Sequence, residues 1–189
     1  MEAPVMSRSK TRFTVAIAIV LVALAATMRL LPHPANFAPV AAISIFGGSV
    51  LPRRHAIWVP LAAMVASDAL IGFYTLPIML SVWGCYVLIA LASSMTLRRF
   101  SLWKLALITP AGSVFFFLVS NFAVWLWSGM YIRTWSGLVQ CYAMAVPFFR
   151  NTLLSDIIYT GLLFGLYAAV SALAGRVFTP SMHSAKEQA

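Results

Sequence analysis

The chain contains few charged residues, and the acidic ones are fewer than the basic ones. Only 9% of its 189 residues are charged, and Asp and Glu together number 4. Hydrophobic residues make up 62%, and the mean hydropathy is +0.92. Soluble domains carry about 25% charged residues, so this composition excludes an ordinary soluble globule. It indicates an integral membrane protein.

Motifs that would indicate an enzyme or a nucleic-acid-binding protein are also absent. The sequence has no Walker motif, Gly-rich phosphate loop, Ser/His/Asp set or metal-binding helix motif. Its two cysteines, Cys85 and Cys141, are too few for a disulfide framework and lack the spacing of a zinc site. The formal net charge of +9 would suggest nucleic acid in a soluble protein, but here the basic residues lie between apolar runs. We therefore expect no enzyme activity, no metal, no cofactor and no nucleic-acid partner.

Six apolar runs divide the chain, and each is a candidate transmembrane helix. They cover Phe13–Leu31, Phe37–Leu51, Ala56–Thr75, Pro77–Leu97, Leu105–Trp127 and Asn151–Gly175. The second run would be a helix of about 22 Å, barely enough to cross a bilayer, so either neighbouring helices shelter it or it enters from a depressed surface. The sequence thus predicts an all-α membrane domain of six helices over residues 13–175, between a basic segment, 1–12, and a tail, 176–189.

One stretch before the last run has several interpretations. Residues Met130–Phe149 are compatible with a re-entrant segment, a lid, an interfacial amphipathic helix or the outer part of the sixth helix. Pro147 predicts a kink or a break, because proline removes a backbone hydrogen bond inside a helix. The sequence leaves these alternatives open.

The basic residues predict which side of the membrane each loop occupies, because cytoplasmic loops carry an excess of Lys and Arg. With six spans, all but three of the 13 basic residues fall on one side. Only Arg29, Arg133 and Arg150 remain for the other side or the membrane interior. The residues on the basic side are Arg8, Lys10, Arg12, Arg53, Arg54, Arg98, Arg99, Lys104, Arg176 and Lys186. We therefore expect a multi-pass protein of the bacterial cytoplasmic (inner) membrane, with both termini in the cytoplasm.

Two aspartates, Asp68 and Asp156, lie inside long apolar segments, and each follows a serine. A carboxylate at mid-bilayer costs roughly 2.5–3.5 kcal/mol, so each needs a compensating environment. A polar cavity inside the bundle is the functional interpretation, and a structural ion pair between helices is the alternative. The flanking residues do not match those of intramembrane aspartyl proteases. Arg150 is six residues from Asp156 and on a different helical face, so the sequence predicts Asp68 as the partner of Arg150.

With this orientation, the internal polar residues gather near the outer end of the predicted bundle. We therefore predict an outward-facing cavity for a small molecule. Its predicted substrate-binding residues are Asp68, Arg150, Asn151, Asp156, Asn121, Asn36, Tyr86, Trp125, Ser81 and Cys85. Like the two aspartates, Trp125 and Cys85 have a second interpretation, Trp125 as part of an ordinary aromatic belt and Cys85 as a small buried hydrophobe.

Two sequence blocks resemble a bacterial family of uncharacterised, predicted transport proteins. The first is Arg29–Ala42 with Phe46–Gly48, and the second is Ser120–Trp125 with Pro147–Leu153. In size and six-helix plan, this family is similar to the S-components of energy-coupling-factor vitamin transporters, with the solitary cobalamin-transporting type as the nearest analogue. The resemblance implies an S-component-like bundle with an outward-facing vitamin site, and transport by toppling of the protein within the membrane.

The same resemblance places Asp68, Tyr86 and Arg150 at polar binding positions of the cobalamin type. That type uses a cysteine of its fourth helix as a cobalt ligand, whereas Ser81 takes the matching position here, with Cys85 one turn deeper. The first span also lacks the Ala-xxx-Ala pattern of S-components that share an energising module. These departures leave the vitamin open and favour a solitary protein or an unconventional energising partner.

The predicted function is uptake of a small organic nutrient, a vitamin or a vitamin precursor, by a membrane transporter or substrate-binding S-component. Its partners would be this substrate, the lipid bilayer and either an energising module or none. The alternative is a non-transport membrane subunit, or a structural component, whose polar cluster docks partner helices. On sequence alone, the substrate, the energy source, the oligomeric state and the reactivity of Cys85 stay open.

Overall fold

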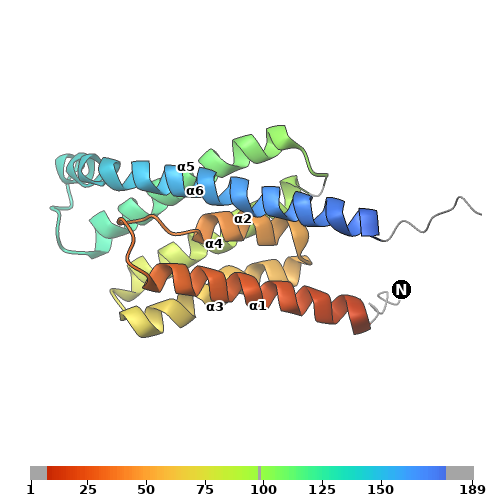
Figure 1. Ribbon diagram of the computed structural model, residues 1–189. Coiled ribbons are helices and arrows are strands. Elements are labelled where there is room, and N and C mark those ends of the chain that lie inside the picture. Colours follow the sequence, from red (N-terminus) through yellow and green to blue (C-terminus); the bar gives the residue numbers. More distant parts are fainter. Residues whose placement is uncertain (1–7, 98, 178–189) are drawn as a thin grey trace, which may run out of the picture.

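The computed structural model describes residues 8–97 and 99–177, and all regular secondary structure in these ranges is helical. The helices lie side by side in one bundle (Figure 1). They are α1 (Arg8–Leu30), α2 (Val40–Val50), α3 (Arg53–Ile71), α4 (Leu76–Thr96), α5 (Leu102–Trp127) and α6 (Trp135–Val177). The prediction of an all-helical fold is thereby confirmed for the described part of the chain.

Proline and glycine account for several of the helix ends. α3 begins directly after Pro52 and ends at Gly72, whose φ of 119° is a conformation that favours glycine. α4 carries Pro77 in its first turn, where the missing backbone N–H breaks no intrahelical hydrogen bond. These breakers divide the apolar sequence into separate helices close to the predicted boundaries.

The longest helix, α6, includes the stretch that the sequence left unassigned. It runs continuously from Trp135 to Val177, so residues 135–149 form its first part rather than a re-entrant segment or a separate lid. Pro147 lies inside this helix and does not end it. At 1.5 Å per residue, its 43 residues extend for about 65 Å, which exceeds the thickness of a bilayer. Part of α6 must therefore project beyond a membrane or cross it at a steep tilt.

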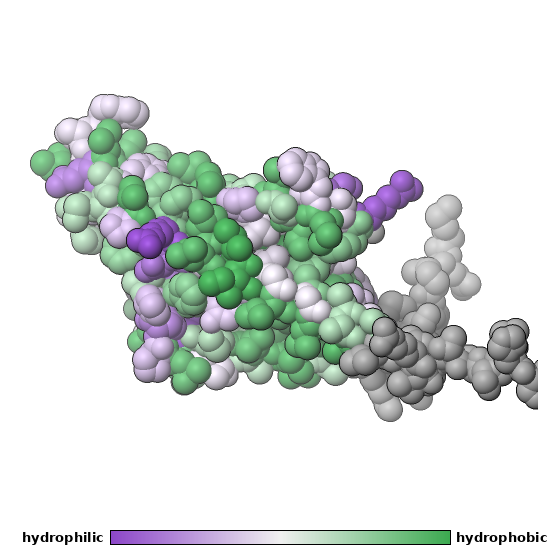
Figure 2. All heavy atoms as spheres, turned by 45° about the horizontal axis from the view of Figure 1, so that its top comes forward, coloured by the Kyte–Doolittle hydropathy of each residue, from purple (hydrophilic) through white to green (hydrophobic). Residues whose placement is uncertain are grey.

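Within residues 8–97 and 99–177, three helices are long and apolar enough to cross a membrane: α4, α5, and α6 from Trp135 to Ala172. The sides of the bundle expose many large hydrophobic side chains, including Leu70, Leu162 and Leu166. In Figure 2, hydrophobic residues cover much of the visible face, while hydrophilic residues gather toward its ends. Soluble monomers rarely expose apolar surface of this extent, so the surface supports a membrane environment.

The short helix α2 lies at the centre of the bundle and contacts each of the other five helices. Its residues from Val40 to Gly48 are all buried, as predicted for a span too short to face lipid alone. A Cβ atom at Gly48 would collide with the carbonyl oxygen of Ala90, so this glycine allows α2 and α4 to pack closely. The other helices follow one another around α2 in the order α1, α3, α4, α5, α6. Within the described residues, the backbones of α1 and α6 do not make contact.

The shortness of α2 leaves part of the bundle centre without a helix. Its 11 residues rise about 16 Å, against roughly 30 Å for a hydrocarbon core. The preceding segment, residues 31–39, contains only turns and irregular structure. The space in front of Val40 is therefore enclosed by the surrounding helices and by this segment, and a cavity lies there.

Candidate functional site

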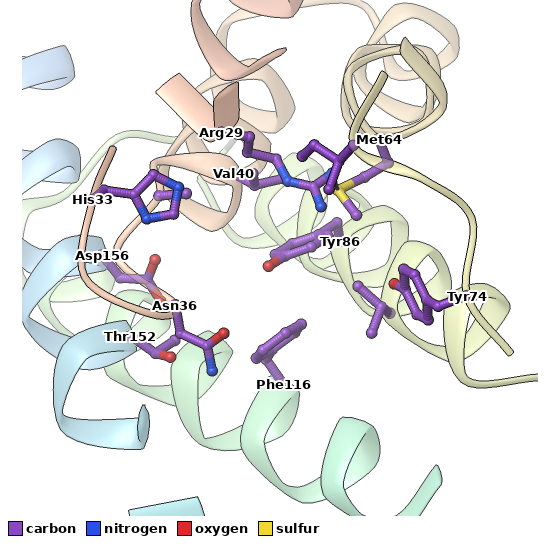
Figure 3. Close-up of a pocket in the computed structure, with 13 residues that line it drawn as sticks. Arg29, His33, Asn36, Val40, Met64, Tyr74, Tyr86, Phe116, Thr152 and Asp156 are labelled. Carbon is purple, nitrogen blue, oxygen red and sulfur yellow. Dashed lines mark hydrogen bonds between the residues drawn. The ribbon is translucent and has the colours of Figure 1, made fainter. Parts of the chain in front are cut away.

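A cavity of about 440 Å³ lies at the end of the bundle where α1 finishes and α2 begins (Figure 3). Every one of the six helices contributes to its wall, as do two of the connecting segments. The lining residues are Arg29, His33, Asn36, Ala38, Val40, Met64, Ile71, Tyr74, Val82, Tyr86, Phe116, Thr152 and Asp156. Small-molecule sites occupy roughly 300–1,000 Å³ and combine apolar walls with a few polar groups, and this cavity has that size and character.

Polar and aromatic side chains occupy different sides of the cavity. In the view of Figure 3, Asn36, Thr152 and Asp156 lie together on one side, below His33. The rings of Tyr86 and Phe116 face them, stacked with centroids 5.0 Å apart and planes at 22°. A ligand in this space would therefore meet hydrogen-bonding groups on one side and aromatic surface on the other.

Arg29, at the end of α1, forms an ion pair with Asp68 of α3. Its Nη2 atom lies 2.7 Å from Oδ1 of Asp68, a side chain that is only 1% exposed. Its Nη1 atom donates to Oγ of Ser67 at 2.5 Å, and the indole Nε1 of Trp83 donates to Oδ2 of Asp68 at 2.8 Å. Both carboxylate oxygens of Asp68 thus have partners, and the cluster joins α1, α3 and α4.

The predicted pairing of Asp68 with Arg150 is wrong. Arg150 is exposed on α6, and α6 makes no contact with α3 within the described residues. Because α1 packs directly against α3, Arg29 is the arginine that reaches Asp68. Asp68 itself is not among the residues that line the cavity, and only its partner Arg29 is.

Asp156 has a different environment, although it is only 2% exposed. Ser113 of α5 donates to its Oδ2 atom at 2.6 Å. Among the described residues, no Lys, Arg or His forms a salt bridge with it, and its Oδ1 atom has no hydrogen-bond donor. Figure 3 shows the carboxylate on the cavity side of α6. Asp156 is therefore a buried acid with one neutral partner and access to the cavity.

Residues 31–39, which we name the entrance loop, cover the cavity beside α6. The amide Nδ2 of Asn151 donates to the carbonyl oxygen of Ala35 at 3.0 Å, and Oγ of Ser155 donates to that of Ala38 at 3.1 Å. Asn36 adopts a φ of 59°, in the left-handed region where asparagine is enriched, and this turn places its side chain at the cavity. Asn151 thus holds the entrance loop on α6, whereas it was predicted to bind the ligand.

A second cavity of about 190 Å³ adjoins the first. The two share Asn36, Val82, Phe116 and Thr152 as walls. Asn121 lines the second cavity and donates from Nδ2 to the carbonyl oxygen of Phe117 at 2.7 Å. Of the predicted residues, Asn36, Tyr86 and Asp156 therefore line the main cavity, and Asn121 lines its neighbour.

Three further predicted residues lie outside both linings. Oγ of Ser81 donates to the carbonyl oxygen of Pro77 within α4, at 2.7 Å. Cys85 is buried and free, one turn further along α4. Nε1 of Trp125 donates to the carbonyl oxygen of Ile132 at 3.1 Å, which anchors the connection between α5 and α6. Like Asp68, Arg150 and Asn151, these three residues line neither cavity.

The prediction also missed residues that the structure brings into the site. Thr152 precedes Asp156 by one helical turn, so the helical period alone could have placed both on one face. Phe116 and Ser113 lie in a uniformly apolar helix, where no pattern distinguishes the inward face from the lipid-facing one. Met64 of α3 was likewise hidden in an apolar run.

The connecting segment between α3 and α4 adds Tyr74 to the wall. Burial, reinforced by the negative charge of Asp68, raises the pKa of Tyr74 to about 12, and Arg29 partly opposes the rise. The phenol therefore stays protonated at neutral pH and is available as a hydrogen-bond donor.

Among the residues that the structure describes, no three His, Cys, Asp or Glu side chains come together as a metal site would require.

The fold and the cavity define a class: over the described residues, a helical bundle of membrane type with a partly polar cavity at one end. The particular family follows from the sequence. Residues 8–179 match the family of unknown function DUF6580, and the chain belongs to this family. No curated protein and no solved structure matches the chain.

Proposed function

We propose that this protein is a membrane transporter, or a substrate-binding subunit similar to an S-component, that takes up a small organic nutrient. The observation that carries this proposal is the cavity of about 440 Å³ to which all six helices contribute. Its mixture of apolar surface with a few convergent polar groups is the usual design of a small-molecule site. A vitamin or vitamin precursor has the size and the mixed polarity that such a space accommodates.

The proposed orientation places the cavity on the outer side of a bacterial cytoplasmic membrane. The connections at the opposite end of the bundle carry Arg53 and Arg54 at the start of α3, and Arg99 and Lys104 around the start of α5. The excess of positive charge favours the cytoplasm for that end. In this proposal all six helices belong to the membrane domain, and both termini lie inside.

The entrance loop supplies a route for exchange with the outside. Among the described residues, two side-chain hydrogen bonds hold it on α6, together with an edge contact between Phe37 and Tyr159, whose ring centroids are 5.9 Å apart. Each such hydrogen bond contributes about 1 kcal/mol net, so the loop can open without disrupting the helices. We propose that the loop opens to admit the substrate, and that an energising module, or toppling of the protein alone, completes transport.

The alternative, in which the polar cluster docks partner helices, has less support. Asp68 and Asp156 are 1% and 2% exposed, and their hydrogen bonds join helices of this chain. A partner helix approaching from the lipid would not reach them. Their environment fits an internal site better than a docking surface.

The test combines ligand binding with transport. Thermal unfolding of the detergent-purified protein is measured against a panel of vitamins and corrinoids. A ligand at 100 times its Kd should stabilise the folded state by about 2.7 kcal/mol. The same ligand should accumulate in proteoliposomes that contain the protein or, where an energising module is needed, in cells that express it.

Leu162→Ala, on the lipid-facing surface, is the matched control and should keep the ligand-induced shift. Stable co-purification with another membrane protein, with no ligand-induced shift and no accumulation, would favour the subunit alternative instead.

A further inference from the structure

The charges around the cavity do not balance. Three charged side chains lie in or directly behind its wall: Arg29, Asp68 and Asp156. Arg29 and Asp68 neutralise each other at 2.7 Å, and the Nη atoms of Arg29 point toward α3, at Ser67, Met64 and Asp68. An anionic ligand would have to compete with Asp68 for this arginine. The acidic group left facing the cavity is therefore the carboxyl of Asp156, whose charged form a cation in the cavity would stabilise.

Among the residues that the structure describes, no cationic side chain pairs with Asp156. A buried carboxylate in a membrane protein normally pairs with a positive charge, and among the described residues Asp156 has only the hydroxyl of Ser113. His33 also lines the cavity, but its Nδ1 atom is engaged with the carbonyl oxygen of Pro34 at 2.8 Å, and it forms no salt bridge with Asp156. The missing positive charge is thus not supplied by the described part of the chain.

The opposite wall is suited to the remainder of such a ligand. Tyr86 and Phe116 lie across the cavity from Asp156 with their rings stacked on each other, and the ring surface that they leave toward the cavity suits the flat apolar body of a ligand. Asn36 and Thr152 lie beside the carboxylate and add hydrogen-bonding atoms. The cavity thus combines one acidic group, aromatic surface and neutral polar groups.

We propose that the substrate is a small organic cation, a protonated amine or a quaternary ammonium with a flat or apolar body. Its positive charge pairs with Asp156, and its body lies against Tyr86 and Phe116. This inference rests on the proposed function, since it names the substrate class of the same cavity. It also assigns different roles to the two buried aspartates: Asp156 binds the ligand, and Asp68 fixes the helices.

The test compares three probes that share one ring and differ in charge: 1-methylnicotinamide, nicotinamide and nicotinate, which are cationic, neutral and anionic. Thiamine, riboflavin and biotin extend the same comparison to larger molecules. Thermal shifts and equilibrium binding are measured on the full-length protein in detergent. The expected result is stabilisation by cationic probes, and little by neutral or anionic ones.

Asp156→Asn should weaken cation binding by a factor on the order of 10–100, because a charge-assisted contact is lost. Asp156→Glu keeps the charge and should retain part of the binding. Leu162→Ala, on the lipid-facing surface, should bind like the parent. If Asp156→Asn fails to fold, the three matched probes on the parent protein still decide the sign of the ligand charge.

The outcomes separate this inference from the proposed function. Stabilisation only by neutral or anionic probes would overturn the cation and leave the transport proposal standing. Equal cation binding by the parent and Asp156→Asn would overturn the role of Asp156. Absence of binding across the panel, with no uptake of any probe, would count against the proposed function and therefore against the inference built on it.

Discussion

Asp68 and Asp156 share a local sequence, yet the fold gives them opposite surroundings. Each follows a serine, and each is almost completely buried in a long helix. One carboxylate oxygen of Asp68 pairs with Arg29, and the other accepts a hydrogen bond from the indole N–H of Trp83. Among the described residues, Asp156 accepts a side-chain hydrogen bond only from the hydroxyl of Ser113. The comparison teaches that the donors supplied by neighbouring helices, and not the local sequence, decide whether a buried acid is paired with a positive charge.

The largest expected effect comes from breaking the ion pair of Asp68. Arg29→Met and Asp68→Asn should each lower the free energy of unfolding by about 3–5 kcal/mol, because each leaves a buried charge without its partner. The double variant should lose less than the sum of the two. Thermal or denaturant unfolding in detergent measures this double-mutant cycle.

Arg150→Met is the control for that cycle, since Arg150 is exposed and should change stability by less than about 0.5 kcal/mol. Additive losses from Arg29→Met and Asp68→Asn would contradict the pairing.

A smaller effect is expected from the second donor to Asp68. Trp83→Phe removes the indole N–H and keeps an aromatic ring, so it should cost about 1.5–3 kcal/mol, the range for a hydrogen bond to a charged group. Trp58→Phe, on the surface of α3 where the side chain is 67% exposed, serves as the matched control. Equal unfolding temperatures for the two variants would show that the indole bond adds nothing to the Asp68 cluster.

The entrance loop extends the comparison to the two serines. Ser67 bonds within the Asp68 cluster, whereas Ser155 bonds to the loop beside Asp156. Asn151→Ala together with Ser155→Ala should cost about 1–2 kcal/mol and speed hydrogen–deuterium exchange in residues 31–39. Exchange in the connection between α5 and α6, residues 128–134, is the internal control and should not change. A uniform increase in both segments would indicate global loosening instead of a released loop.

The smallest effect on stability is expected at Asp156. Asp156→Asn removes a buried carboxylate that has no cationic partner, and the amide can still bond to Ser113. The free energy of unfolding in the absence of ligand should therefore change by less than about 1 kcal/mol, with the sign favouring the variant. Unfolding measured beside Asp68→Asn gives the direct contrast. Comparable losses in both would remove the distinction between the two aspartates.

The fold was predictable where apolar runs meet helix breakers. Pro52, Gly72 and Pro77 divide the chain near the predicted boundaries, and the shelter of the second run follows from its length. The course of α6 through Pro147 was not predictable, because proline only disfavours a helix interior, and tertiary packing decides the outcome.

The site was predictable only in part. The position of a polar residue along an apolar helix indicates its depth in the membrane, but not which neighbouring helix its side chain faces. Depth alone placed Asn36, Tyr86 and Asp156 near one another, and all three line the cavity. The partner of Asp68 depended on which helices are neighbours, and no local pattern in the sequence reports that α1 packs against α3 and α6 does not. Phe116 was not predicted either, because the face of α5 that turns inward is as apolar as its other faces.

The position at which α2 starts has a consequence for how the cavity of such a bundle can change in evolution. Val40 lines the cavity at the start of α2, and the five other helices pack around α2. One added turn at the start of α2 would extend the helix by about 5.4 Å toward the cavity, and one lost turn would shorten it equally. A single insertion or deletion in the entrance loop could therefore resize the binding space for a different molecule while the outer scaffold stays as it is.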